Sequence, residues 1–197
     1  FIGAVGIAVR AIAPHCKSKA TDPAVIVLDE RGRFSIPILS GHLGGANDLA
    51  EKLASICGAV PVITTATDVE GVFAVDEWAK AQNCHVLEPE RIKTVSGTLL
   101  AGKVAYYDSQ WKITGTQPKN VFPADENHQA DFSVTLHPQS DALHLVPKIC
   151  VLGVGCKRGT SSEHIEATFK QFCKETGCAL QSICAVSYTH LTLPTKL

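Results

Sequence analysis

The sequence predicts an α/β protein, because strand-like and helix-like segments alternate along most of the chain. The clearest unit is a strand–helix–strand run. An apolar run at 34–39 is followed by a glycine-rich turn, a segment with helical apolar spacing at 49–57 and another apolar run from Pro61. A second glycine-rich turn follows the apolar run at 149–154. Both turns join a strand to a helix, which is typical of α/β proteins.

The segment before this unit predicts a helix and a strand pair. Residues 4–13 form the helix, and residues 24–28 and 34–39 are short runs joined by a polar turn, so we expect the two strands to be antiparallel. Pro37 indicates an edge position or a bulge, because proline cannot donate to the sheet. The apolar positions that predict the helix are Val5, Val9 and Ile12.

The middle of the chain mixes both element types. We expect helices at 75–82 and 88–100, strands at 104–107 and 131–136, and a loop at 114–130. The apolar face of the earlier helix is predicted to be Leu49, Leu53, Ile56 and Cys57.

A last helix is predicted at 161–176. Thr160 and Glu163 fit the T-x-x-E capping box, and Gly177 supplies its end. Its predicted apolar face is Ile165, Phe169, Phe172 and Cys173.

These elements predict an N-terminal βαβ-containing domain, a mixed α/β middle region and an incomplete α/β C-terminal domain. Phe1 replaces the usual Met, and the last residues continue no α/β pattern, so we expect a fragment that is truncated at both ends and inactive by itself. The predicted bounds are 1–60 for the first domain, 61–147 for the middle region, 148–186 for the truncated domain and 187–197 for a non-native tail.

Composition narrows the class of function. The net charge of −1 and the pI of about 6.8 argue against a nucleic-acid partner. No apolar run reaches the ~18 residues that a membrane helix needs, and we expect a cytoplasmic protein. The eight cysteines form no C-x-x-C pair and no zinc-site spacing with histidine, so they predict reduced core residues and no metal site.

The turn Gly41–Asn47 is the first candidate site. Its glycines and the following helix start favour an anion, although a tight turn that packs a helix on a sheet explains the glycines equally well. His42 is the natural proton carrier near neutral pH, or else a histidine that bonds the loop backbone. Asn47 and Asp48 could simply cap the helix.

Two further segments carry polar groups at strand ends. Thr64, Thr65 and Asp68 follow the strand that begins at Pro61, and we expect them to face the glycine turn unless their hydroxyls only satisfy local turns. The loop after 149–154 adds cations to a helix start and predicts an anion site without the P-loop pattern. Its candidate residues are Gly155, Lys157, Arg158 and Thr160.

At these motifs the chain resembles the cobalt-precorrin-5A hydrolase family. The stretch GHLGGANDLAEKLASICGAVPVITTATDVEGVFAVDEWA is similar to the signature of that family, and AVRAIAPHCKSKATDPAVIVLDERGRFSIPILS is similar to its N-terminal domain. ICVLGVGCKRGTSSEHIEATF resembles the opening of its C-terminal domain. The resemblance covers roughly residues 1–186.

The resemblance implies a hydrolase of cobalamin biosynthesis. Its substrate is cobalt-precorrin-5A, a polycarboxylate tetrapyrrole whose ring-A δ-lactone is opened by water; acetaldehyde leaves and cobalt-precorrin-5B remains. The cobalt belongs to the substrate, so no cofactor and no protein metal is expected. Neighbouring enzymes of the pathway are possible partners.

Within that reaction we expect His42 and Asp68 to handle protons, with the amides of Gly44 and Gly45 as oxyanion donors. The predicted substrate-binding residues are Gly41, Gly44, Gly45, Asn47, Thr64, Thr65, Gly155, Lys157, Arg158 and Thr160. Two other classes of function stay open: a non-catalytic module that binds tetrapyrroles, and a nucleotide-binding α/β protein.

Overall fold

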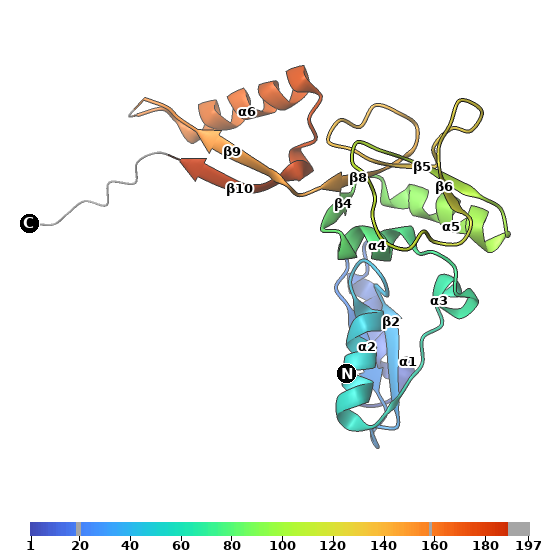
Figure 1. Ribbon diagram of the computed structural model, residues 1–197. Helices are drawn as coiled ribbons and strands as arrows, with labels where there is room; N and C mark the ends of the chain where they lie inside the picture. Colours follow the sequence, from blue (N-terminus) through green and yellow to red (C-terminus); the bar gives the residue numbers. More distant parts are fainter. Residues whose placement is uncertain (19–20, 158, 189–197) are drawn as a thin grey trace, which may run out of the picture.

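The computed structural model describes residues 1–18, 21–157 and 159–188, and it confirms the α/β class. Three sheets follow one another along the chain (Figure 1). The first contains β1–β3, the second contains β4–β8, and the third pairs β9 with β10.

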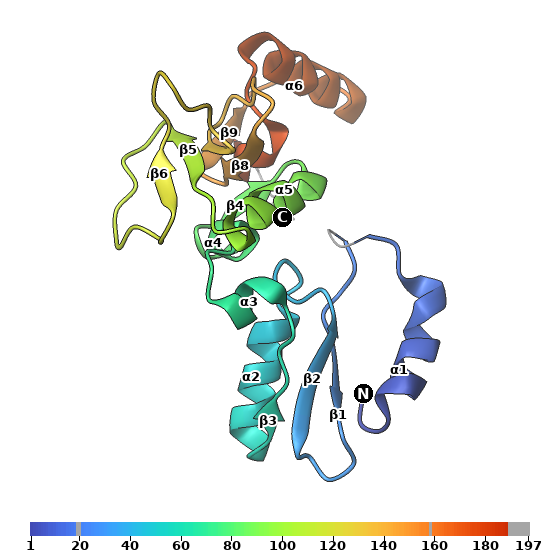
Figure 2. The same ribbon diagram turned by 90° about the vertical axis from the view of Figure 1, so that its right-hand side faces the viewer.

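The first sheet contains the predicted strand–helix–strand unit. β1 (Val25–Leu28) pairs antiparallel with β2 (Phe34–Leu39), as predicted. β2 pairs parallel with β3 (Val60–Pro61), and α2 (Ala46–Cys57) makes the crossover between them. Figure 2 shows α1 (Val5–Ile12) and α2 on the two sides of this sheet, with the short 3-10 helix η1 (Ala13–His15) after α1.

Pro37 lies in the central strand, so the edge position was the wrong alternative. Val25 pairs with Leu39 and Ile26 with Pro37, which leaves one extra residue on β2 between the two pairs. This irregularity is the bulge that the proline predicted, and it lets a residue without an N–H group sit inside a sheet.

The predicted apolar face of α2 was wrong. Leu49 and Ile56 are 41% and 80% exposed, and only Leu53 packs against the small core of the first sheet. The buried side chains of α2 are Ala46, Asn47, Ala50 and Ala54. The alanines recur every four residues and so lie on one face, where their small size allows a close approach to the sheet. The prediction missed this face because it relied on the large apolar residues. In α1 likewise Ala8 is buried while Val9 is 45% exposed.

The second sheet has the strand order β4-β8-β7-β5-β6, in which β4 is antiparallel to β8 and the remaining neighbours are parallel. Its elements are α3 (Ala66–Glu70), α4 (Val75–Ala81), β4 (Cys84–Val86), η2 (Pro89–Arg91), α5 (Ile92–Leu100), β5 (Ala105–Ser109), β6 (Val121–Pro123), β7 (Phe132–Val134) and β8 (Leu143–Pro147).

Both predicted helices of this region and the strands at β5 and β7 are confirmed. β6 lies inside the predicted loop 114–130, and β4 and β8 were not predicted. β4 and β6 have three residues each, too few to show a period, and Pro147 was taken as a boundary although it ends β8.

The main core lies between this sheet and the helices α4 and α5. Phe132, Leu143 and Leu145 point from β7 and β8 into it, and Val75 and Val95 meet them from the helices. Since side chains alternate along a strand, the residues between these positions face the other way. Ser133 and His144 therefore lie on the opposite face of the sheet.

The C-terminal unit consists of β9 (Cys150–Val154), α6 (Ser162–Thr176), η3 (Leu180–Ser182) and β10 (Ile183–Tyr188), with β10 parallel to β9. The capping box was placed one residue too early. Ser161, not Thr160, is the N-cap, and its hydroxyl accepts the His164 N–H at 3.3 Å. Gly177 ends α6 in the left-handed conformation, as predicted. The tail predicted at 187–197 lies almost wholly outside the described residues.

All eight cysteines are free, but the expectation that they fill the core was wrong. Four are exposed and four are half-buried. None of the helices in the described ranges is both long and apolar enough to span a bilayer. The proposed division at residues 60 and 147 stays a prediction; the first boundary falls inside β3 and the second between β8 and β9.

We expect Leu145→Ala to destabilise the protein by about 2–5 kcal/mol, because it leaves a cavity at a position that is 0% exposed. Urea unfolding followed by circular dichroism measures the change. Ile56→Ala is the control, because this side chain is 80% exposed and should change the stability by less than ~0.5 kcal/mol. Equal effects of the two substitutions would contradict the placement of the core.

Candidate active site

The glycine-rich turn joins β2 to α2 in a tight, strained conformation. Ser40 has a φ of 58°, which is uncommon outside glycine, and Gly45 has a φ of 79°. The carbonyl oxygens of Ser40 and Gly41 accept the amides of Ala46 and Asn47 at 3.0 and 3.1 Å. The turn is therefore closed on itself before the helix begins.

Close packing inside the turn explains two of its glycines. A Cβ on Gly44 would lie 2.3 Å from Ser40 Cβ, and one on Gly41 would lie 2.9 Å from Asn47 Oδ1. The Gly45 amide donates to the His42 carbonyl oxygen at 2.9 Å, so it is already engaged and the expectation that it serves as an oxyanion donor is not supported. Substrate binding by Gly41 and Gly44 stays a prediction.

His42 is the centre of the site. Its side chain is buried. Nδ1 lies 3.1 Å from Asp76 Oδ1, and Nε2 lies 3.1 Å from Asp68 Oδ2. Asp76 is on α4 and Asp68 on α3, so one ring connects three elements of the fold. This is a row of carboxylate, imidazole and carboxylate.

The row keeps His42 protonated. The hydrogen bond to Asp76 raises the pKa of His42 to about 9; burial opposes this, and the charge of Asp76 and the bond and charge of Asp68 add to it. With two carboxylates as partners, both ring nitrogens donate. At neutral pH His42 is therefore suited to give a proton and not to take one.

The predicted meeting of the turn with the segment after β3 is confirmed. Asn47 Nδ2 donates to Thr65 Oγ1 at 3.0 Å and to Asp68 Oδ2 at 2.8 Å. Asn47 thus connects the two segments and does not cap α2, whose N-cap is Gly45 with no side-chain bond. Thr64 is exposed beside them.

A cavity of about 290 Å³ opens next to this row. Its polar lining is mostly acidic, which differs from the anion site that the glycines suggested. Asp68 has its side chain 30% exposed there and is the member of the row that solvent can reach. The lining residues are Asn47, Asp48, Glu51, Ile63, Asp68, Val69 and Glu77.

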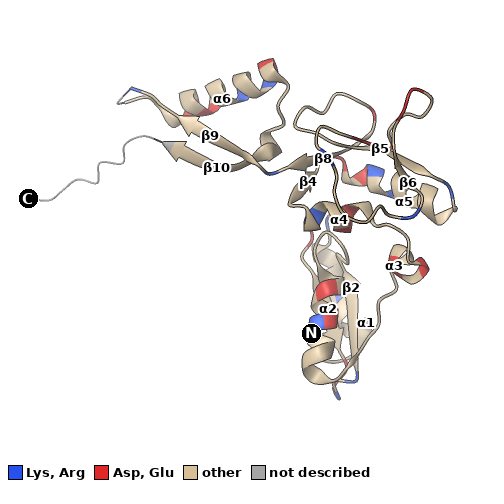
Figure 3. Ribbon diagram, in the orientation of Figure 1, with Lys and Arg blue, Asp and Glu red and all other residues tan. Residues whose placement is uncertain are grey.

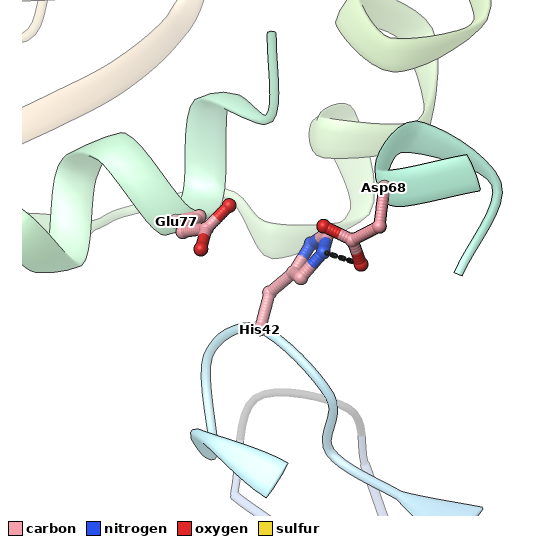
Figure 4. A group of neighbouring side chains, drawn as sticks. All are labelled: His42, Asp68 and Glu77. Atoms are coloured by element: carbon pink, nitrogen blue, oxygen red, sulfur yellow. Dashed lines mark hydrogen bonds and ion pairs between the residues drawn. The ribbon is translucent and has the colours of Figure 1, made fainter. Parts of the chain in front are cut away.

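Figure 4 shows Glu77 beside the pair of His42 and Asp68. One potential ligand atom from each of the three lies within 4.8 Å of the others, an arrangement that could hold a metal ion. A metal ion on His42 Nε2 would have to displace the proton that this nitrogen donates to Asp68. The absence of a protein metal stays a prediction.

Sequence reasoning missed Asp76 and Glu77. Acidic residues in the first turn of a helix are common because they complement the helix dipole, so these two gave no separate signal. The usable signal was the spacing of Asp76 and Ala79, because residues three apart on a helix share one face, and the structure shows both buried. A carboxylate on that buried side needs a partner.

The second predicted site lies on a different unit of the molecule, between β9 and α6 (Figure 1). Gly155, Lys157 and Thr160 line a cavity of about 790 Å³, together with apolar residues of both elements. Lys157 is exposed, and Thr160 Oγ1 donates to its carbonyl oxygen at 2.8 Å. Arg158 lies outside the described residues. Figure 3 shows acidic and basic residues interspersed on the chain.

Comparisons with known proteins identify two regions of the chain. The family described as "Cobalamin synthesis G N-terminal" matches residues 1–68, and "Cobalamin synthesis G C-terminus" matches residues 150–191. The first match contains both His42 and Asp68.

Two curated relatives are named cobalt-precorrin-5A hydrolase. The one from Salmonella typhimurium is 40% identical over 81% of this chain and 50% of its own length. The one from Priestia megaterium is 30% identical over 94% of this chain and 55% of its own length. The chain thus spans about half the length of the curated relatives it matches.

A solved structure of a cobalamin biosynthesis protein G homologue from Sulfolobus solfataricus shares 22% identity and a TM-score of 0.46, over 95% of this chain and 57% of that one. The family assignment rests on the family models and the curated relatives.

We expect His42 to make folding stability depend on pH. Its pKa is higher in the folded protein than the ordinary 6.5, so its contribution is fully present below pH 6.5 and is lost as the pH rises through about 9. The loss corresponds to about 3 kcal/mol. Urea unfolding of the parent and of His42→Gln across this range measures it, with exposed His15→Gln as the control. Parallel pH profiles for the parent and His42→Gln would contradict the row.

Proposed function

Because the chain belongs to the cobalamin synthesis G family, we propose that the protein acts as a cobalt-precorrin-5A hydrolase. The reaction opens the ring-A δ-lactone with water, releases acetaldehyde and leaves cobalt-precorrin-5B. The observation that carries the proposal is the row of Asp76, His42 and Asp68, two of whose members lie within the N-terminal family match.

The row divides the proton work between two groups. Asp68 is a carboxylate at the edge of the acidic cavity, and we assign to it the removal of a proton from water. His42 carries a proton on both ring nitrogens but does not line the cavity, so its Nε2 proton reaches the leaving oxygen by way of Asp68. Asn47 and His42 both bond Oδ2 of Asp68, which fixes the carboxylate for this role.

Asp76 acts through His42. It is 1% exposed and reaches Nδ1 from behind the ring, so it is a positioning residue in this mechanism. Its charge also stabilises the imidazolium form that delivers the proton.

The acidic cavity suits the proton transfer but not the substrate carboxylates, which like charges repel. We therefore assign carboxylate binding to the loop after β9, where Lys157 is exposed beside Thr160 and Gly155. Arg158, the next residue in the sequence, is part of the same assignment. No cofactor, contact with neighbouring pathway enzymes and a cytoplasmic location remain parts of the proposal.

We expect His42→Ala in a full-length form to lower the turnover of cobalt-precorrin-5A by ~10²–10⁴-fold and to change substrate affinity much less, because a positioned proton donor acts in the transition state. Acetaldehyde release measures turnover, and a spectral titration of the tetrapyrrole measures affinity. His15→Ala is the matched control, since His15 is exposed on η1. Binding without any acetaldehyde from the parent would identify a tetrapyrrole-binding module instead.

We expect the double variant Lys157→Ala, Arg158→Ala to bind cobalt-precorrin-5A roughly 2- to 10-fold more weakly, because exposed ion pairs contribute little each. The loss should be largest at low salt, and the salt dependence of binding should become flatter. The same titration at several ionic strengths measures both. Lys103→Ala removes an exposed charge from another unit and is the control. An unchanged salt dependence would remove the loop from substrate binding.

A further inference from the structure

A second hydrogen-bonded row lies at the five-stranded sheet, on residues that the glycine turn does not touch. His144 Nδ1 lies 2.9 Å from Glu88 Oε1, and its backbone N–H donates to Glu88 Oε2 at 2.9 Å. On the other side of the ring, Nε2 lies 3.2 Å from Ser140 Oγ. The row is therefore carboxylate, imidazole and hydroxyl.

The partners determine which nitrogen carries the proton. A carboxylate only accepts, so in the neutral ring Nδ1 holds the hydrogen and donates it to Glu88. Nε2 is then free to accept from the hydroxyl of Ser140. This is the arrangement in which a histidine activates a serine as a nucleophile.

The hydroxyl side of the row faces a cavity. Ser140 and His144 line a space of about 800 Å³ whose other lining side chains are mainly polar, among them Gln110, Thr135 and His137. His144 itself is 3% exposed, so its ring is shielded while the loop that carries Ser140 is open. A small ester entering the cavity would meet the hydroxyl before the ring.

An independent feature of the same cavity indicates a ligand. Ser133 Oγ is buried and has no hydrogen-bond partner within the described part of the chain, and Ser133 is 6% exposed. Ser133 pairs with His144 on the neighbouring strand, so both side chains lie on the face that lines the cavity. An unused donor at that place fits the oxygen of a bound carbonyl.

The position of Ser140 is held from two directions. Its Oγ accepts the Ala142 N–H at 3.3 Å. Arg91 Nη1 donates to the carbonyl oxygens of Asp141 and Ala142, the second at 2.7 Å. A purely structural role for Glu88 and His144 would tie η2 to β8 without any group at Nε2. A structural role does not explain the Ser140 hydroxyl at Nε2 or the buried hydroxyl of Ser133 beside it, which has no partner among the described residues.

From this geometry we propose that Ser140, His144 and Glu88 form a nucleophilic triad that hydrolyses small, polar carboxylic esters in the cavity. Ser140 Oγ adds to the carbonyl carbon while its proton passes to His144 Nε2. The ester C–O bond breaks, and that proton leaves with the alcohol. Water then gives a proton to the same Nε2 and attacks the acyl–Ser140 ester. As the acyl C–O bond breaks, Nε2 returns the proton to Ser140 Oγ and the acid is released. Glu88 is the positioning residue, and Ser133 donates to the oxyanion.

The proposal is tested on the whole 197-residue chain with two probes that contain no tetrapyrrole, so its outcome is independent of the proposed lactone reaction. A fluorophosphonate should label Ser140, as located by peptide mass spectrometry. After the free thiols are blocked, steady-state hydrolysis of 4-nitrophenyl acetate should fall at least ~10²-fold in Ser140→Ala. Ser162→Ala, an exposed serine on α6, should behave as the parent.

Two further variants separate catalysis from folding. Ser133→Ala should lower the ester turnover by ~10²–10³-fold with unchanged stability, because the hydroxyl that it removes has no partner to lose. Glu88→Gln should lower kcat much more than it changes KM and should alter the pH profile of kcat, as loss of the orienting carboxylate requires. Phosphonate labelling at another residue, or equal steady-state hydrolysis by folded parent and Ser140→Ala, would overturn the triad.

Discussion

The burial of one charged imidazole between two carboxylates is the constraint on which the candidate active site depends. His42 reaches Asp68 on α3 and Asp76 on α4, each at 3.1 Å. A neutral ring could donate to only one of them, and the other carboxylate would then face a lone pair. The protonation of His42 and the packing of the turn against α3 and α4 therefore depend on each other. The two carboxylates stabilise the charged ring, and the charged ring holds both carboxylates in place.

The glycine turn positions His42 between these two carboxylates. Gly41 and Gly44 leave the space that Asn47 and Ser40 occupy, so the turn can close tightly. His42 points from the turn toward Asp68 (Figure 4). The buried alanines of α2 let the helix pack close to β2, which also positions the turn that joins them. Asn47, on the buried side of that helix, then reaches Asp68 Oδ2 and holds the carboxylate on the histidine. The small residues thus allow the close packing that brings Asn47 and His42 within hydrogen-bond distance of Asp68.

Sequence patterns predicted the local units and one half of the site. The strand–helix–strand run around the glycine turn and the meeting of that turn with Asp68 both followed from chain order, since the carboxyl ends of parallel strands meet at one edge. Asp76 did not follow, because a first-turn acid on a short helix has an ordinary electrostatic explanation. The row of Glu88, Ser140 and His144 was also out of reach: it depends on β8, which Pro147 concealed, and on contacts between residues 56 apart.

The two histidine rows show how partner identity selects chemistry. His42 has a carboxylate at each nitrogen, so it retains its proton well above neutral pH and can only lend it. His144 has a carboxylate at Nδ1 and a hydroxyl at Nε2, so one nitrogen is orientated as a donor and the other is left to accept. Exchanging a carboxylate for a serine at one nitrogen thus turns a proton store into a base. The two rows share no residue, and each lies against its own cavity.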